Sequence, residues 1–123
     1  MTGKNPGGLR ITLEAAADCI HAANYQTLPH EGAPGLEYPA DVYAALGNLK
    51  LLCQYLPQLA GQIGDWLMGE YAAGKVASDT GTDAGAWVME AAAALMTASS
   101  RAEDMAQALS AAQNATSSLK AAR

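Results

Sequence analysis

Residues 84–119 read AGAWVMEAAAALMTASSRAEDMAQALSAAQNATSSL, with no proline and no glycine after Gly85. Apolar or small side chains return along this stretch in alternating steps of three and four residues, the period of one helix face. The repeating positions are Val88, Ala91, Leu95, Ala98, Ala102, Met105, Leu109, Ala112, Thr116 and Leu119. The pattern predicts one continuous helix over residues 84–119, with Thr82 or Asp83 as its N-cap.

A second stretch, residues 39–73, has the same period. Its apolar positions are Val42, Leu46, Leu49, Cys53, Leu56, Ala60, Ile63 and Leu67. Because the phase continues across Pro57, we predict one helix that is kinked there, since a proline ring clashes with the preceding turn. Two helices that meet at residues 55–57 are the alternative. Pro39 suits a first helical turn, and Gly74 suits the position just after a helix end.

These two helices are nearly equal, at roughly 35 residues or about 50 Å each. A short turn at residues 75–83 joins them, so the sequence predicts a long antiparallel helical hairpin. Residues 9–24 have helical spacing too, and we expect this short helix to pack across the hairpin. Its apolar series is Leu9, Leu13, Ala16, Ile20 and Ala23.

The remaining segments complete the predicted domain. Residues 1–8 are rich in glycine and polar side chains and predict a disordered N-terminus. Residues 25–38 hold two prolines and two glycines without periodicity and predict a loop. Isoleucine and valine together number six and phenylalanine is absent, which disfavours a β-sheet. The fold class is therefore all-α and three-helix bundle-like, with residues 9–123 forming a single helical domain.

Alanine dominates the apolar composition. Of 123 residues, 28 are alanine, and the larger hydrophobic residues are about one in four. Small side chains let helices approach closely but bury little area each. A long alanine-lined helix is marginal alone, so a second covering surface is expected, supplied by another copy or by a partner helix. The alternative is that alanine is simply the best helix former.

The interaction residues that we single out lie on the last helix and near the bend. They are Ala98, Ala102, Met105, Leu109, Ala112, Trp66 and Trp87. The two tryptophans are expected to close the bend end as core residues, because large rings fill the space that alanine leaves. A docking hot spot is the alternative for them.

Charge and hydropathy exclude several classes of partner. The chain has 12 acidic and 7 basic residues, a net charge of −5, and no basic stripe. Direct binding to nucleic acid or to an anionic membrane surface is therefore disfavoured. No run of roughly 18 apolar residues could span a membrane, and no apolar leader is visible, so we expect a cytoplasmic protein. Cys19 and Cys53 are expected to be reduced, buried thiols, with a disulfide between them as the alternative.

Few residues have the spacing of a chemical site. Glu14, Asp18 and His21 share one face of the first helix and are candidate metal ligands, although a solvated polar face explains them as well. His30 lies in the predicted loop with no nucleophile beside it. We therefore expect no catalytic residues and no cofactor, and the protein is predicted not to be an enzyme.

Two resemblances add to this picture. Residues 38–59 (YPADVYAALGNLKLLCQYLPQL) resemble a segment of small uncharacterised actinobacterial proteins, which implies that Gly47 and Pro57 are built-in features and implies no activity. The hairpin is also similar to the helical-hairpin substrates of type VII secretion, which carry Trp-x-Gly at the bend. Here Trp66 and Gly69 are separated by two residues and precede the bend.

The expected function is that of a non-catalytic helical interaction or adaptor protein. It would act by self-association, as a homo-oligomer, or by binding a partner protein. A secreted type VII-like hairpin is one alternative. A small-ligand or metal-binding helical bundle is the other.

Overall fold

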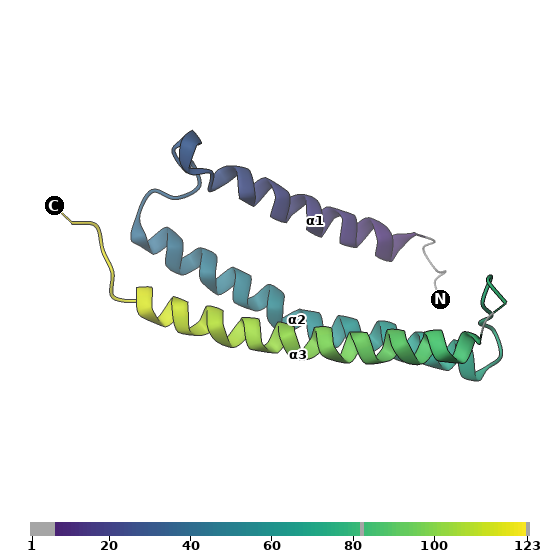
Figure 1. The fold of residues 1–123 in the computed structure, drawn as a ribbon. Coiled ribbons are helices and arrows are strands. Elements are labelled where there is room, and N and C mark those ends of the chain that lie inside the picture. Colours follow the sequence, from purple (N-terminus) through teal and green to yellow (C-terminus); the bar gives the residue numbers. More distant parts are fainter. Residues whose placement is uncertain (1–6, 82, 123) are drawn as a thin grey trace, which may run out of the picture. The chain divides into compact units, whose positions relative to one another are not determined.

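The computed structural model describes residues 7–81 and 83–122. In these residues it contains helices α1 (Gly8–Gln26), α2 (Pro39–Ala72) and α3 (Ala84–Thr116), a 3-10 turn η1 (Pro29–Glu31), and no strand (Figure 1). The predicted all-α fold class is confirmed, and every helix bound lies within three residues of its prediction. Of the N-terminal segment predicted to be disordered, residues 1–6 lie outside the described residues, and Gly8 already belongs to α1.

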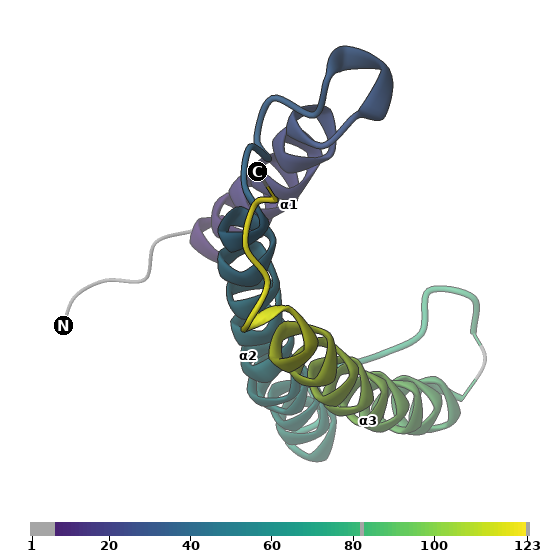
Figure 2. The same ribbon diagram turned by 90° about the vertical axis from the view of Figure 1, so that its left-hand side faces the viewer.

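The helices α2 and α3 run antiparallel and side by side (Figures 1 and 2). With the turn between them they form one compact unit, Tyr43–Ser118, which we name the hairpin. The helix α2 is continuous through Pro57, so the prediction of one helix is confirmed over that of two.

Both helix ends at the bend are capped as the sequence predicts. Gly74 adopts a φ of 77°, and its N–H donates to the carbonyl oxygen of Tyr71 at 2.9 Å. The N–H of Lys75 donates to the carbonyl oxygen of Glu70 at 2.9 Å, which completes a Schellman motif. Asp83 is the N-cap of α3, and its Oδ1 accepts from the N–H of Gly85 at 2.9 Å. Thr82, the other predicted cap, lies outside the described residues.

The interface between the two helices is thin. Among the described residues, the buried hydrophobic ones are Cys53, Val88, Ala102 and Ala106, exposed by 5%, 4%, 9% and 7%. The positions that are at least half-buried include, on α2, Leu46, Leu49, Cys53, Pro57, Ala60, Gly64 and Leu67, and, on α3, Val88, Ala92, Leu95, Ser99, Ala102, Ala106, Leu109 and Gln113. Small residues at many of these positions allow a close approach but bury little apolar area.

Glycines mark the points of close contact along the hairpin. A Cβ atom on Gly64 would lie 3.4 Å from Cδ1 of Leu95, at the middle of the interface. Near the open end, the Nε2 of Gln113 lies beside Gly47 and donates to the carbonyl oxygen of Tyr43 at 3.4 Å. At the bend, the Tyr71 hydroxyl lies against Gly85.

Some positions of the predicted apolar seams lie at the α2–α3 interface, and others are exposed. On α3, the residues Ala98, Met105 and Ala112 are exposed, and Ser99, Ala106 and Gln113 take their places at the interface. On α2, Leu56 and Ile63 are 48% and 38% exposed. Their successors, Pro57 and Gly64, face α3 instead. Gly64 has no side chain, so Leu95 of α3 packs against it.

Of the described residues, 7–42 and 119–122 belong to the second compact unit. No residue of α1 is buried, so the expectation of a buried Cys19 is wrong, whereas that of a buried Cys53 is confirmed; both thiols are free. That α1 packs across the hairpin, and that residues 9–123 form one domain, stay predictions.

Backbone hydrogen bonds order the predicted loop between α1 and α2. The N–H of Gly35 donates to the carbonyl oxygen of Gln26 at 2.7 Å. Asp41, in the first turn of α2, accepts from the N–H groups of Glu37 and Tyr38 at 2.8 Å each through Oδ2. The hydrogen bond from Tyr38, followed by that from Glu37, lowers the pKa of the Asp41 carboxyl below its ordinary value. The start of α2 is thus fixed by its own carboxylate, as in a capping box.

Candidate interaction surface

One side of the hairpin presents a row of mostly exposed apolar side chains. We name it the apolar side; it comprises Leu52, Leu56, Leu59, Ile63 and Trp66 of α2 and Trp87, Ala91, Ala94, Ala98 and Met105 of α3. All of them are exposed except Leu59 and Ala91, which are half-buried. The steps of three and four residues place each set on one helix face.

A shallow groove runs along the apolar side between the two helices. It has a volume of about 200 Å³ and is lined by Leu56, Leu59, Ala60, Ile63, Leu95, Ala98 and Ala102. Every lining residue is apolar. Two charged side chains have the spacing of this side. Glu70 follows Trp66 by four residues, and Arg101, between Ala98 and Met105, lies 4.0 Å from the carboxylate of Asp104. The groove itself therefore offers no charge that a covering surface would have to desolvate.

The opposite side of the same two helices has a different chemistry. We name it the polar side; it comprises Lys50, Gln54, Asp65, Ser100, Glu103 and Gln107. A hollow of about 480 Å³ on this side is lined by Gln54, Pro57, Glu103, Asp104, Ala106 and Gln107. Nearer the bend, Met68 and Met96 line a smaller hollow of about 160 Å³ together with Asp65 and Ser99.

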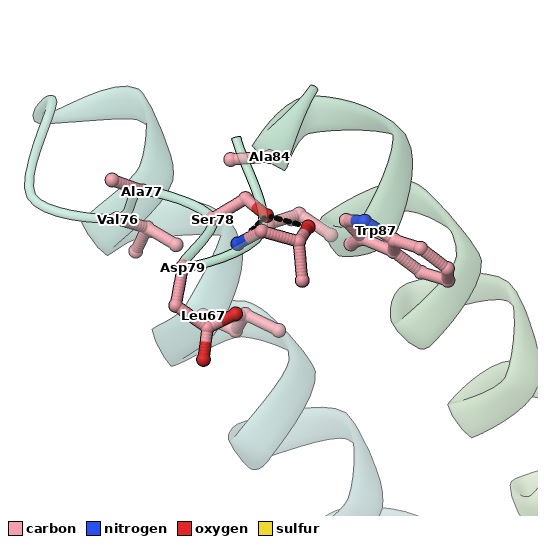
Figure 3. Close-up of a pocket in the computed structure, with 9 residues that line it drawn as sticks. Leu67, Val76, Ala77, Ser78, Asp79, Ala84 and Trp87 are labelled. Carbon is pink, nitrogen blue, oxygen red and sulfur yellow. Dashed lines mark hydrogen bonds between the residues drawn. The ribbon is translucent and has the colours of Figure 1, made fainter. Parts of the chain in front are cut away.

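A third hollow lies at the bend, with a volume of about 550 Å³ (Figure 3). Residues 76–80 form one wall, and the Trp87 indole of α3 stands across from them. The hydroxyls of Ser78 and Thr80 are 2.8 Å apart and bonded to each other. Among the described residues that line this hollow, Asp79 alone is titratable. The hollow therefore does not bring an acid, a base and a nucleophile together, as a catalytic site would.

The structure does not bring the candidate metal ligands together. Glu14 pairs with Arg10 at 2.8 Å on the exposed surface of α1, and the His21 ring meets the edge of Tyr25 with centroids 5.3 Å apart. Over residues 7–81 and 83–122, no group of three or more His, Cys, Asp or Glu side chains could hold a metal ion. The geometry agrees with the alternative reading of this face as solvated.

The predicted interaction residues are divided by the hairpin interface. Ala102 is buried and Leu109 half-buried between the helices, whereas Ala98, Met105 and Ala112 are exposed. These exposed positions of α3 were predicted as part of the seam, and the structure leaves them available for another surface.

The expectation that the tryptophans form the core of the bend is wrong. Trp66 is 66% and Trp87 is 56% exposed. The physical reason is that each tryptophan comes one residue before an interface position, Leu67 or Val88, so its side chain is turned away from the α2–α3 contact.

Sequence reasoning missed Leu56 and Ile63 as surface residues. A signal was present one residue later in each case. In both cases the following residue, Pro57 or Gly64, lies at the interface and the preceding large side chain is left outside.

Comparison of the chain with protein-family models, with curated proteins and with solved structures found no match in any of the three. A search of the described helices for one long and apolar enough to cross a membrane found none.

Proposed function

We propose that this protein is a non-catalytic helical interaction protein and that the apolar side of the hairpin is its working surface. The observation that carries the proposal is the imbalance between what the hairpin covers and what it exposes. In the described residues, no side chain is less than 2% exposed, while Leu52, Leu56, Ile63, Trp66 and Trp87 are all exposed.

The energetics favour covering this side. Burial of a large apolar side chain stabilises by about 1.5–3 kcal/mol relative to leaving it in water. A surface that covered Leu56, Ile63 and the two tryptophans would contribute several times that amount. The α2–α3 interface has little comparable burial to offer, because two of its four buried hydrophobic positions are alanines.

The placement of polar groups supports a binding role over a catalytic one. The hollow on the polar side is lined in part by Glu103 and Asp104, whereas no charged side chain lines the groove on the apolar side. The hydrogen bonds that lower the pKa of Asp41 belong to the start of α2, so the cause of this shift is structural. The arrangement is therefore suited to holding another helix rather than to transferring a proton or a group.

Site-specific photo-crosslinking tests this proposal. A benzophenone amino acid replaces Ala98 on the apolar side, and the matched control replaces Ser100, which is exposed two residues later on the polar side. After irradiation in the cells that make the protein, mass spectrometry identifies the adduct. We expect a defined adduct, with the protein itself or with another protein, from position 98 only. Equal adducts from both positions, or none from either, would contradict the proposal.

A further inference from the structure

We infer that the hollow at the bend binds a small organic cation, an ammonium group that carries methyl or other apolar substituents. This site goes beyond the proposed function, which concerns contacts along the apolar side of the helices. Three observations carry the inference: the size of the hollow, its apolar base, and the sign of the charge on its loop wall (Figure 3).

The hollow is large enough for a small molecule and offers it an apolar bed. Its volume of about 550 Å³ lies within the roughly 300–1,000 Å³ that is typical of small-ligand sites. Val88 is 4% exposed and Leu67 is half-buried, so these two side chains lie at its base. The other apolar residues that line it are Val76, Ala77, Ala84 and Trp87.

The Trp87 ring is the apolar group that favours a cation over a neutral ligand. An indole attracts a cation through the quadrupole of its ring, and aromatic rings are the usual means by which proteins recognise substituted ammonium groups. Trp87 stands across the hollow from residues 76–80 and is 56% exposed, so a ligand seated in the hollow contacts its ring.

The loop wall opposite the indole supplies a negative charge. Asp79 is the charged residue among those that line the hollow, and it is exposed. The hydroxyls of Ser78 and Thr80 are bonded to each other at 2.8 Å, and the N–H of Thr80 donates to Oγ of Ser78 at 3.2 Å. These two residues therefore hold the wall in shape, while the Asp79 carboxylate sets the charge that a ligand meets.

The surroundings of the hollow keep this sign. The C-terminus of α2 and the N-terminus of α3 meet at the bend, so their opposite partial charges offset each other. Between Glu70 and Asp83 the chain has three acidic residues and one basic residue, Lys75. An anion would meet a net negative charge here, whereas a cation meets a complementary one.

A cation and its neutral isostere distinguish this occupant from an apolar ligand without charge. Trp66→Phe leaves Trp87 as the sole tryptophan, so its fluorescence reports on the hollow. The probes are choline and 3,3-dimethylbutanol, in which a carbon atom replaces the charged nitrogen, titrated at constant ionic strength. We expect a saturable change with choline in the millimolar range, and a dissociation constant at least about fivefold higher for the alcohol.

Two variants in the same background separate the charge from the shape of the site. Asp79→Asn removes the charge at nearly constant volume and should raise the dissociation constant of choline by about three- to fivefold. The matched control Asp65→Asn makes the same change at an exposed position of α2 that does not line the hollow, and should leave it within about 1.5-fold.

A third variant tests the ring itself. Trp87→Leu keeps an apolar side chain but removes the quadrupole, so choline should shift the Val88 methyl resonances less than in the parent chain at equal concentration. No saturable change with choline, equal binding of the alcohol, equal effects of the two aspartate variants, or an unchanged Val88 response in Trp87→Leu would overturn the inference. Ala98 does not line the hollow, so the photo-adduct from position 98 tests the proposed function separately.

Discussion

The two sides of the hairpin are built from the same pair of helices, yet the groove on one side and the hollow opposite it expose different chemistries. On the apolar side, the groove that includes Ile63 and Ala98 has only apolar lining residues. On the polar side, the corresponding hollow is lined by Gln54, Glu103 and Gln107. A monomer that needed only solubility would gain nothing from this asymmetry. The difference therefore indicates that one side is to be covered and the other is to face water.

The largest expected effect comes from placing a charge in the middle of the apolar side. Ile63→Lys should weaken binding to the apolar side by about a hundredfold, or about 3 kcal/mol, because an ammonium group replaces a large apolar side chain beside the groove. Gln54→Lys makes a comparable change on the polar side of the same helix and should leave this binding within about twofold. The yield of the photo-adduct from position 98 compares both, and equal effects of the two variants would remove the distinction between the sides.

The next largest effect separates alanines between the helices from alanines on the apolar side. Ala106→Leu forces a larger side chain into a position that is 7% exposed and should lower the free energy of unfolding by about 1–3 kcal/mol. Ala94→Leu, at an exposed position of the same helix, should change it by less than about 0.5 kcal/mol.

Urea unfolding followed by circular dichroism measures this pair of variants at a protein concentration where both are monomeric. Equal destabilisation would mean that α3 presents a different face to α2 than the structure shows.

How far the sequence predicts this molecule depends on the scale of the feature. The helix bounds follow from local signals, since Pro39 begins α2, Gly74 follows its end and Asp83 caps α3. Which face of each helix packs against the other helix does not follow from such signals. In a helix with alanine at both 91 and 92, a contact stripe can pass through either position at little difference in buried area.

The choice between these stripes is made by the partner helix. On α2 the contact passes through Pro57 and Gly64, and Leu95 of α3 packs against Gly64, so the stripe on α3 passes through Leu95. For the same reason the candidate surface was predicted only in part. Ala98 and Met105 were singled out, but Leu56 and Ile63 were assigned to the core.

A smaller effect is expected from glycines on the polar side. Nothing lies within 4 Å of a Cβ atom on Gly61, so Gly61→Ala should stabilise the hairpin by up to about 1 kcal/mol through its higher helix propensity. The matched variant Gly47→Ala should gain less, because the new methyl group meets Nε2 of Gln113 and displaces its hydrogen bond to Tyr43.

Thermal unfolding and photo-crosslinking measure the two glycine variants together. Since Gly61 lies away from the apolar side, Gly61→Ala should raise the unfolding temperature without changing the yield of the photo-adduct from position 98. A change in this yield would show that the polar side takes part in binding.

The smallest expected effect is a pH dependence confined to the start of α2, away from the apolar side. The pKa of Asp41 in the folded chain is lowered from its ordinary value of 3.8. A carboxyl with a lowered folded pKa contributes stability that is fully present above the ordinary value and is lost as the pH falls through the folded value. The amide protons of Glu37 and Tyr38, which donate to Asp41, should therefore lose protection from hydrogen exchange on acidification below about pH 4.

Asp41→Asn should abolish this dependence, because an amide has no proton to take up in this range. Amides around Ile63, measured in the same spectra, serve as the internal control. If they lost protection in parallel with Glu37 and Tyr38, the acid response would belong to the hairpin as a whole rather than to the carboxylate at its entrance.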